Sequence, residues 1–364
     1  MIRSAQAQED CRRGTTRLVR GDRAGALAEF DRALEADPHY PEAYNNRGVA
    51  RHRLGDLAGA LADFDRALEL APRYAEAYTN HGTARHALGD YAGAVADFDQ
   101  ALAIDPRHAE PHNNRGAARH ALGDPAGALA DFDRAAELRP GYAEAYHNRG
   151  AARHALGDPD GAVADFSQAL RLDPHLAESY FGRGEARYAL GDYPGAVADY
   201  DEALRLTPRP APAAIYHSRG GARHAAGDLA GAIADYDSAI ELDPGLCTAY
   251  ISRGHARYHR RDPLGINDYR FAFQLDARLA AAEIIRALLQ DLRRDPEAAL
   301  ENCRRHLRIN PADLVAYARR GLTLRLLGRD VEAEQDFQQA LSRAPEWAGP
   351  LRLLIDEATQ RREP

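Results

Sequence analysis

A stretch of 34 residues, PEAYNNRGVARHRLGDLAGALADFDRALELAPRY, runs from Pro41 to Tyr74 and returns almost unchanged at residues 75, 109, 143 and 177. A unit this short cannot bury its own apolar face, so neighbouring copies must stack and share a continuous core. The chain is therefore predicted to be a linear array whose 364 residues need no division into compact domains. Positions within each unit are counted from 1, which makes Pro41 position 1.

Each unit is predicted to form two helices joined by a turn. Positions 4, 7, 8 and 11 share one side of a first helix, which we name helix A. Gly55 suits a left-handed end for this helix, and Asp56 can cap the next one. Apolar residues at positions 20, 24, 27 and 28 form the packing stripe of the second helix, helix B, which ends at the proline of position 32.

The small and aromatic residues of the unit resemble the signature of the tetratricopeptide repeat family. In the first clear copy they are Gly48, Ala60, Phe64, Ala67 and Pro72. The resemblance implies an all-α fold, a right-handed α-solenoid of about ten helix-turn-helix repeats. The sequence departs from the family at position 4, where Tyr replaces Trp, and at positions 7 and 11, which carry Arg.

The predicted repeat array covers residues 5–346, with joints near residues 40, 74, 108, 142, 176, 212, 246, 279 and 313. Residues 347–364 are predicted to form an amphipathic helix that caps the last repeat. Repeats eight and nine are irregular. Phe271 and Phe273 flank the shortened helix B of repeat eight, where they either repack an irregular core or mark a second, hydrophobic docking surface.

Composition limits the partners and the compartment. A net charge of -8 argues against non-specific binding to nucleic acid. No stretch approaches the roughly 20 apolar residues of a membrane helix, and the N-terminal residues do not read as a signal peptide. Cys11, Cys247 and Cys303 are scattered, without metal or redox spacing. We expect a cytoplasmic protein without a nucleic-acid or membrane partner.

Positions 2, 5, 6, 9, 12 and 13 lie on the side of helix A opposite its packing stripe. In the tetratricopeptide family this side lines a concave, ligand-binding groove, so the resemblance implies a groove here. The predicted partner-binding residues are polar side chains at three of these positions. They are Asn46, Asn80, Asn114 and Asn148 at position 6; His52, His86, His120, His154, Tyr188 and His224 at position 12; and Asn45, Asn113 and His147 at position 5.

The asparagine row favours contact with a peptide backbone, because each amide offers a donor and an acceptor together. Position 6 also resembles the asparagine ladder in the repeat array of O-linked N-acetylglucosamine transferase, which implies a grip on the backbone of a partner. The likeness covers that array alone. The alternative is that these asparagines cap local backbone or face water, and recur because the repeats were duplicated.

The histidine row does not predict a metal site. Neighbouring helices lie about 8–10 Å apart, whereas zinc needs each nitrogen at about 2 Å. Equivalent histidines one repeat apart would have to lean far together, so we expect neither metal nor cofactor. The favoured interpretation is a partly protonated wall, since an unperturbed histidine titrates at about pH 6.5. This interpretation predicts tighter binding of acidic or aromatic groups as the pH falls.

Arginine at position 7 and aspartate at position 23 are predicted to pair inside each repeat, because a buried unpaired charge is costly. The family's carboxylate clamp uses Lys and Asn at positions 5 and 9. It is not predicted here, because position 9 reads Val49, Thr83, Ala117 and Ala151.

No nucleophile set, phosphate loop or metal cluster predicts an enzyme. The predicted function is a non-catalytic protein–protein interaction scaffold that binds a peptide segment of a partner protein in the groove. The alternative is a structural repeat protein that self-associates end to end or through repeat nine.

Overall fold

The computed structural model describes residues 2–260, 262, 264–276, 279–280, 296–309, 311–312, 314–343, 351–352, 355 and 359. Every regular element in these ranges is an α-helix, which confirms the predicted all-α array. None of those helices combines the length and apolar character needed to cross a membrane. The chain forms two compact units, residues 1–190 and 191–364.

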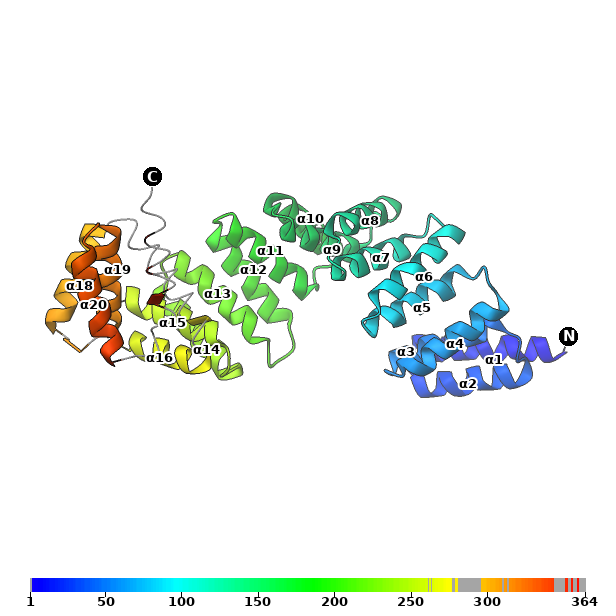
Figure 1. Ribbon diagram of the computed structural model, residues 1–364. Helices are drawn as coiled ribbons and strands as arrows, with labels where there is room; N and C mark the ends of the chain where they lie inside the picture. The colour runs from blue at the N-terminus through cyan, green and yellow to red at the C-terminus, as the bar shows by residue number, and fades with distance from the viewer. Residues whose placement is uncertain are drawn as a thin grey trace. The chain divides into compact units, whose positions relative to one another are not determined.

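In the first unit, antiparallel helix pairs stand side by side in chain order (Figure 1). Each B helix contacts the A helices of its own repeat and of the next, and consecutive A helices also contact each other. The A helices are α1 (Ile2–Val19), α3 (Pro41–Arg53), α5 (Ala75–Ala87), α7 (Ala109–Ala121), α9 (Ala143–Ala155) and α11 (Ala177–Ala189). The B helices are α2 (Arg23–Ala36), α4 (Leu57–Leu70), α6 (Tyr91–Ile104), α8 (Pro125–Leu138) and α10 (Pro159–Leu172).

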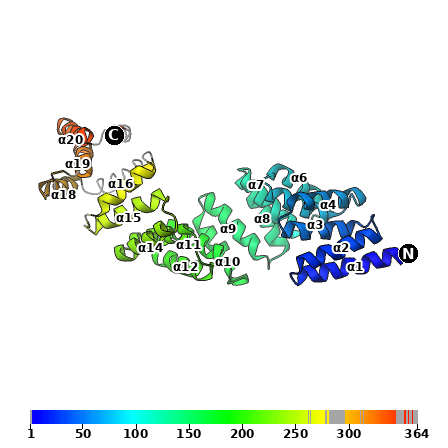
Figure 2. The ribbon, with the colours of Figure 1, turned by 90° about the horizontal axis from the view of Figure 1, so that it is seen from below.

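The second unit continues the same pattern (Figure 2). Helix α13 packs on α12, α14 and α15. Helix α15 also packs on α14 and α16. Helix α19 packs on α18 and α20. The helices are α12 (Tyr193–Leu206), α13 (Ala213–Ala225), α14 (Leu229–Leu242), α15 (Cys247–His259), α16 (Gly265–Leu275), α18 (Pro296–Ile309), α19 (Leu314–Leu326) and α20 (Asp330–Arg343).

Two predicted elements fall mostly outside the described residues. One is the first helix of irregular repeat nine, beyond Ala280, and the other is the capping helix at residues 347–364. Of the latter, Leu351 is buried with Leu322 and Phe337, and Ile355 packs against the same cluster. Those two side chains therefore cover apolar surface of the last described helix pair.

The turn between helices A and B is set by a glycine and an aspartate. Gly55 has φ 84°, a backbone conformation that glycine adopts without steric cost. The Asp56 side chain accepts the backbone N–H of Gly59 and caps α4. The predicted stop and cap are thus confirmed.

The core of each repeat is an aromatic ring pressed against a glycine. Phe64 is 1% exposed, and a Cβ added to Gly48 would lie 2.6 Å from its Cε1. Ala60 is fully buried in the same cluster as this ring, and Ala67 on the same helix is also fully buried. The prediction that small residues permit close helix contact while the aromatic side chain fills the space is confirmed.

Candidate functional site

Asparagines at position 6 link each A helix to the one before it. Asn80 Nδ2 donates to Asn45 Oδ1 at 2.9 Å, and Asn148 Nδ2 donates to Asn113 Oδ1 at the same distance. Each pair is 35 residues apart in the chain, one more than the repeat length. Position 6 of one repeat therefore faces position 5 of the preceding repeat.

Asn46 and Asn114 make a different link. Their Nδ2 atoms lie 3.4 Å and 3.3 Å from the hydroxyl oxygens of Thr15 and Thr83, at position 9 of the preceding repeats. The Oδ1 of Asn114 accepts from Asn113 Nδ2 at 3.2 Å, and Asn46 Oδ1 is similarly placed at 3.4 Å from the amide of its own neighbour. The hydrogen-bond pattern therefore alternates from one repeat to the next.

Two of the three predicted position-5 residues, both asparagines, lie deeper than the position-6 asparagines. Asn45 is 0% exposed and Asn113 is 6% exposed, whereas the four position-6 asparagines are half-buried. His147 Nδ1 lies 2.9 Å from Ser179 Oγ on the next A helix, and burial lowers the pKa of this imidazole. These three side chains are held between adjacent A helices, where they support the surface above them.

The position-12 histidines of the first unit are not alike. Burial lowers the pKa of both His52 and His86, so these two rings are neutral at neutral pH. His86 also packs edge-on against Tyr91, with ring centroids 5.1 Å apart. His120 is exposed and His154 is half-buried. The row is therefore mixed in environment, with two rings shifted by burial and one exposed.

Tyr188, in the last A helix of the first unit, is 42% exposed. In the second unit, His224 Nε2 lies 2.7 Å from His259 Nδ1 on the next A helix. The structure thus brings one predicted histidine against a second imidazole.

Within the ranges described above, no group of three or more His, Cys, Asp or Glu side chains could hold a metal ion.

Arginines at position 7 join three helices through carboxylates. Arg47 donates from Nε and Nη2 to the 3% exposed Asp63 at 3.0 Å and 2.6 Å, which confirms the predicted pairing within a repeat. Its Nη1 also donates to Asp31 of the preceding repeat at 2.7 Å, a contact the sequence reading missed. The same bridge recurs at Arg115, Arg149, Arg219 and Arg253.

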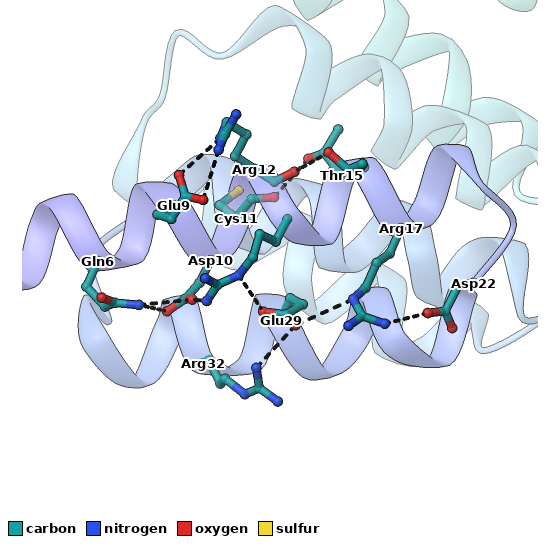
Figure 3. Close-up of polar contacts among 12 residues, drawn as sticks. Gln6, Glu9, Asp10, Cys11, Arg12, Thr15, Arg17, Asp22, Glu29 and Arg32 are labelled. Atoms are coloured by element: carbon teal, nitrogen blue, oxygen red, sulfur yellow. Dashed lines mark hydrogen bonds and ion pairs between the residues drawn. The ribbon is translucent and has the colours of Figure 1, made fainter.

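The first repeat builds this network with a glutamate (Figure 3). Arg13 donates to Glu29 at 3.2 Å and also contacts Asp10, while Arg17 lies 3.5 Å from Glu29. Both acidic side chains are buried. The atypical Asp10 at position 4 is therefore part of the ion-pair network and not an exposed surface group.

One A helix replaces the arginine with His81, which is 4% exposed. Its Nδ1 lies 2.9 Å from Asp97 Oδ2 in the same repeat, and its Nε2 lies 3.4 Å from Asp65 Oδ1 in the preceding one. The imidazole thus occupies the place of the guanidinium between two carboxylates. Like the arginines, it links neighbouring helices and is not one of the predicted partner-binding residues.

Of the two aromatic residues singled out in repeat eight, Phe271 is 54% exposed and stacks on Tyr250 with ring centroids 5.8 Å apart. The side chain of Phe273 lies outside the described part of the structure. An exposed ring at this place is consistent with the second of the two interpretations, a hydrophobic surface.

Comparisons with known proteins agree with this architecture. Tetratricopeptide repeat models match residues 11–75, 82–123, 147–211, 213–246 and 314–346. No curated protein matches the sequence. Solved structures of similar fold do exist.

A tetratricopeptide repeat protein from Parabacteroides merdae has a TM-score of 0.50 and 21% identity, covering 69% of this chain and 99% of that one. Pseudomonas aeruginosa pilF has a TM-score of 0.54 and 20% identity, and the match covers 60% of this chain and 97% of that one. A chain of the Cut9–Hcn1 hetero-tetramer of the APC/C has a TM-score of 0.57 and 17% identity, and the match covers 73% of this chain and 52% of that one. At such identities the likeness shows the fold alone.

Proposed function

Because the chain belongs to the tetratricopeptide repeat family, we propose that it is a non-catalytic cytoplasmic scaffold that holds a peptide segment of a partner protein on its helix A face. The helix A face is the surface formed by positions 2, 6, 9, 12 and 13 of the A helices in repeats two to five. Family membership supports the general role of a protein–protein interaction scaffold. The surface chemistry supports a peptide as the ligand.

The observation that carries the proposal is the state of the amides of Asn80 and Asn148. Each uses one N–H to reach the preceding A helix, and its carbonyl oxygen has no hydrogen bond within the described residues. An amide has two N–H donors and a carbonyl with two acceptor sites, so each side chain retains a donor and an acceptor. Those are the groups that a peptide backbone needs.

The spacing of the repeats suits an extended chain. Packed helices lie about 8–10 Å apart, and an extended peptide advances about 3.3–3.6 Å per residue. Roughly every third peptide residue would therefore meet one position-6 asparagine. Such contacts bind the peptide backbone and do not select its side chains. Any preference for particular peptide side chains would come from the other positions of the helix A face.

The two buried position-5 asparagines hold the position-6 side chains in place before a ligand binds. Asn45 and Asn113 accept the N–H of the next asparagine at 2.9 Å, which restricts the rotamers of Asn80 and Asn148. A side chain already held in its bound conformation loses less entropy when a ligand arrives. Asn45 and Asn113 thus act as positioning residues, without touching the peptide.

The test is affinity capture from the native host with the wild type and with a variant carrying Asn46→Ala, Asn80→Ala, Asn114→Ala and Asn148→Ala. A control carries Arg66→Ala, Gln100→Ala and Arg134→Ala, which are exposed on B helices of the same repeats. We expect partners to be lost with the asparagine variant alone, at an unchanged circular dichroism spectrum. Equal capture by all three proteins would refute the proposal. Concentration-dependent light scattering without partners would favour self-association.

A further inference from the structure

Two imidazole rings converge where repeat seven meets repeat eight. His224 lies in the last turn of α13 and His259 is the last residue of α15, and these helices are in contact. His224 Nε2 and His259 Nδ1 are 2.7 Å apart, and the ring centroids are 5.0 Å apart. His259 is exposed and His224 is half-buried, so an ion from solvent can reach the pair.

The pairing follows from the same offset that links the asparagines. His224 at position 12 faces His259 at position 13 of the next repeat, 35 residues later. The residue 35 positions after each of the four other histidines of this row is alanine, at Ala87, Ala121, Ala155 and Ala189. At residue 259 it is histidine, so the ring of His224 meets a second ring. Equivalent histidines of neighbouring repeats are 34 residues apart and too distant to share an ion, whereas His224 and His259 are 35 residues apart and in contact.

The nitrogen separation selects the class of ion. With metal–nitrogen bonds of about 2.05 Å, two nitrogens at a right angle are about 2.9 Å apart, and at a tetrahedral angle about 3.3 Å. The observed 2.7 Å is nearer the first value. Right-angled coordination by nitrogen and oxygen is typical of Cu²⁺ and Ni²⁺, and Cu²⁺ binds such ligands most tightly of the divalent first-row ions.

The local charges permit a cation at this place. Arg223 directly precedes His224, and Arg260 directly follows His259. Each of these arginines is paired with a carboxylate. Arg223 donates to Asp235 at 2.8 Å, and Arg260 donates to Asp262 at 2.9 Å. These ion pairs reduce the repulsion that a divalent ion would meet.

We propose that His224 and His259 form a two-histidine site for Cu²⁺ or Ni²⁺ across the joint between repeats seven and eight. The ion binds one nitrogen from each ring in place of the hydrogen between them, and the ring that carried this hydrogen keeps it on its other nitrogen, so both ligands are neutral imidazoles. Water completes its coordination, because within the described ranges no third His, Cys, Asp or Glu side chain forms a metal-binding group with the pair. The site does not depend on peptide binding to the first unit.

The full-length chain without a histidine tag is titrated with Cu²⁺, Ni²⁺ and Zn²⁺ in a non-coordinating buffer, with calorimetry for affinity and pulsed electron paramagnetic resonance for bound nitrogens. His224→Ala and His259→Ala are compared with His120→Ala, which removes an exposed histidine that has alanine, and not histidine, 35 residues later. A second pair of variants, His224→Gln and His259→Gln, keeps a polar side chain at each position. Circular dichroism checks the fold of each variant.

The expected result is one Cu²⁺ site with two imidazole nitrogens, and an affinity that falls at least tenfold with any substitution of His224 or His259. His120→Ala should leave it unchanged, and Zn²⁺ should bind more weakly than Cu²⁺ and Ni²⁺. Cu²⁺ affinity equal in the wild type and in the His224 and His259 variants would show an adventitious ion elsewhere and overturn the proposal. So would a spectrum with a single coordinated imidazole, or the absence of saturable binding.

Discussion

The capping carboxylate of Asp56 occupies the space where a side chain on Gly59 would begin. Asp56 Oδ1 accepts the Gly59 backbone N–H at 2.9 Å, and a Cβ on Gly59 would lie 2.1 Å from Oδ2. Asp90 and Gly93 repeat the relationship. Glycine at position 19 is therefore a consequence of the cap, although glycine is a poor helix former.

This relationship predicts non-additive substitutions. Gly59→Ala alone should not stabilise the protein, because the gain in helix propensity of up to about 1 kcal/mol is offset by loss of a cap worth about 1 kcal/mol. In an Asp56→Ala background the same change should stabilise by up to about 1 kcal/mol, since no carboxylate remains to be displaced. Urea unfolding of the four proteins measures the coupling. Equal effects in both backgrounds would contradict it.

Adjacent glycines in α13 offer a matched pair. A Cβ on Gly220 would lie 2.7 Å from Tyr236 Cε1, whereas a Cβ on Gly221 would have no heavy atom within 4 Å. Gly220→Ala should destabilise by about 1–3 kcal/mol through overpacking, and Gly221→Ala should stabilise by up to about 1 kcal/mol. Thermal unfolding of the two variants tests the opposite signs. A stabilising Gly220→Ala would show that the ring is free to move.

The arginine bridges are predicted to matter for stability more than surface ion pairs do. Arg149 donates to the 3% exposed Asp165 at 2.9 Å, and Arg153 donates to the same carboxylate at 2.8 Å. Arg149→Ala should cost about 3 kcal/mol, the low end for a broken buried pair, because Arg153 remains. Arg134→Ala, which breaks an exposed pair with Glu137, is the control and should change little. Similar unfolding midpoints for both variants would be inconsistent with this ranking.

His147 should make the first unit less stable in acid. Burial lowers its pKa in the folded state, while the charges of Glu178 and Glu144 oppose the shift in part. Below about pH 6.5 the unfolded chain therefore binds a proton that the folded chain does not, and stability falls by at most about 1.4 kcal/mol for each pH unit. His147→Gln should reduce the loss of unfolding free energy between pH 7.5 and pH 5.5.

The control for this prediction is His120→Gln, a substitution of an exposed ring on the preceding A helix. It makes the same chemical change at a ring that is not enclosed between helices, so a difference between the two variants reports on burial of His147. An unchanged pH dependence in the His147→Gln protein would mean that other groups, such as His52 and His86, account for the acid sensitivity.

The sequence predicts what is local to one repeat. Gly48 with Phe64, Gly55 with Asp56, and Arg47 with Asp63 all lie within one unit, and helical periodicity places them correctly. Contacts between repeats were not predicted. These contacts depend on the register of one A helix against the next. In the structure that register pairs residues that are 31 or 35 apart in the chain. A helical wheel describes one helix and therefore carries no information on this register.

That register explains how the candidate site differs from its prediction. On a helical wheel at about 100° per residue, position 5 lies about 60° and position 6 about 100° from the nearer edge of the packing stripe, so the wheel places both outside it. In the array, Asn45 is enclosed between neighbouring A helices, whereas Asn80 at position 6 stays half-buried. Sequence positions that correlate at 35 rather than 34 residues, such as Asn45 with Asn80, are the signal that would have indicated this arrangement.

The central claim is that a partner segment lies on the helix A face through the position-6 asparagines. The most direct measurement is hydrogen–deuterium exchange of the purified protein with and without its captured partner. The account predicts added protection in α3, α5, α7 and α9, and loss of that protection in the quadruple asparagine variant. Protection confined to the B helices, or retained in full by the variant, would contradict it.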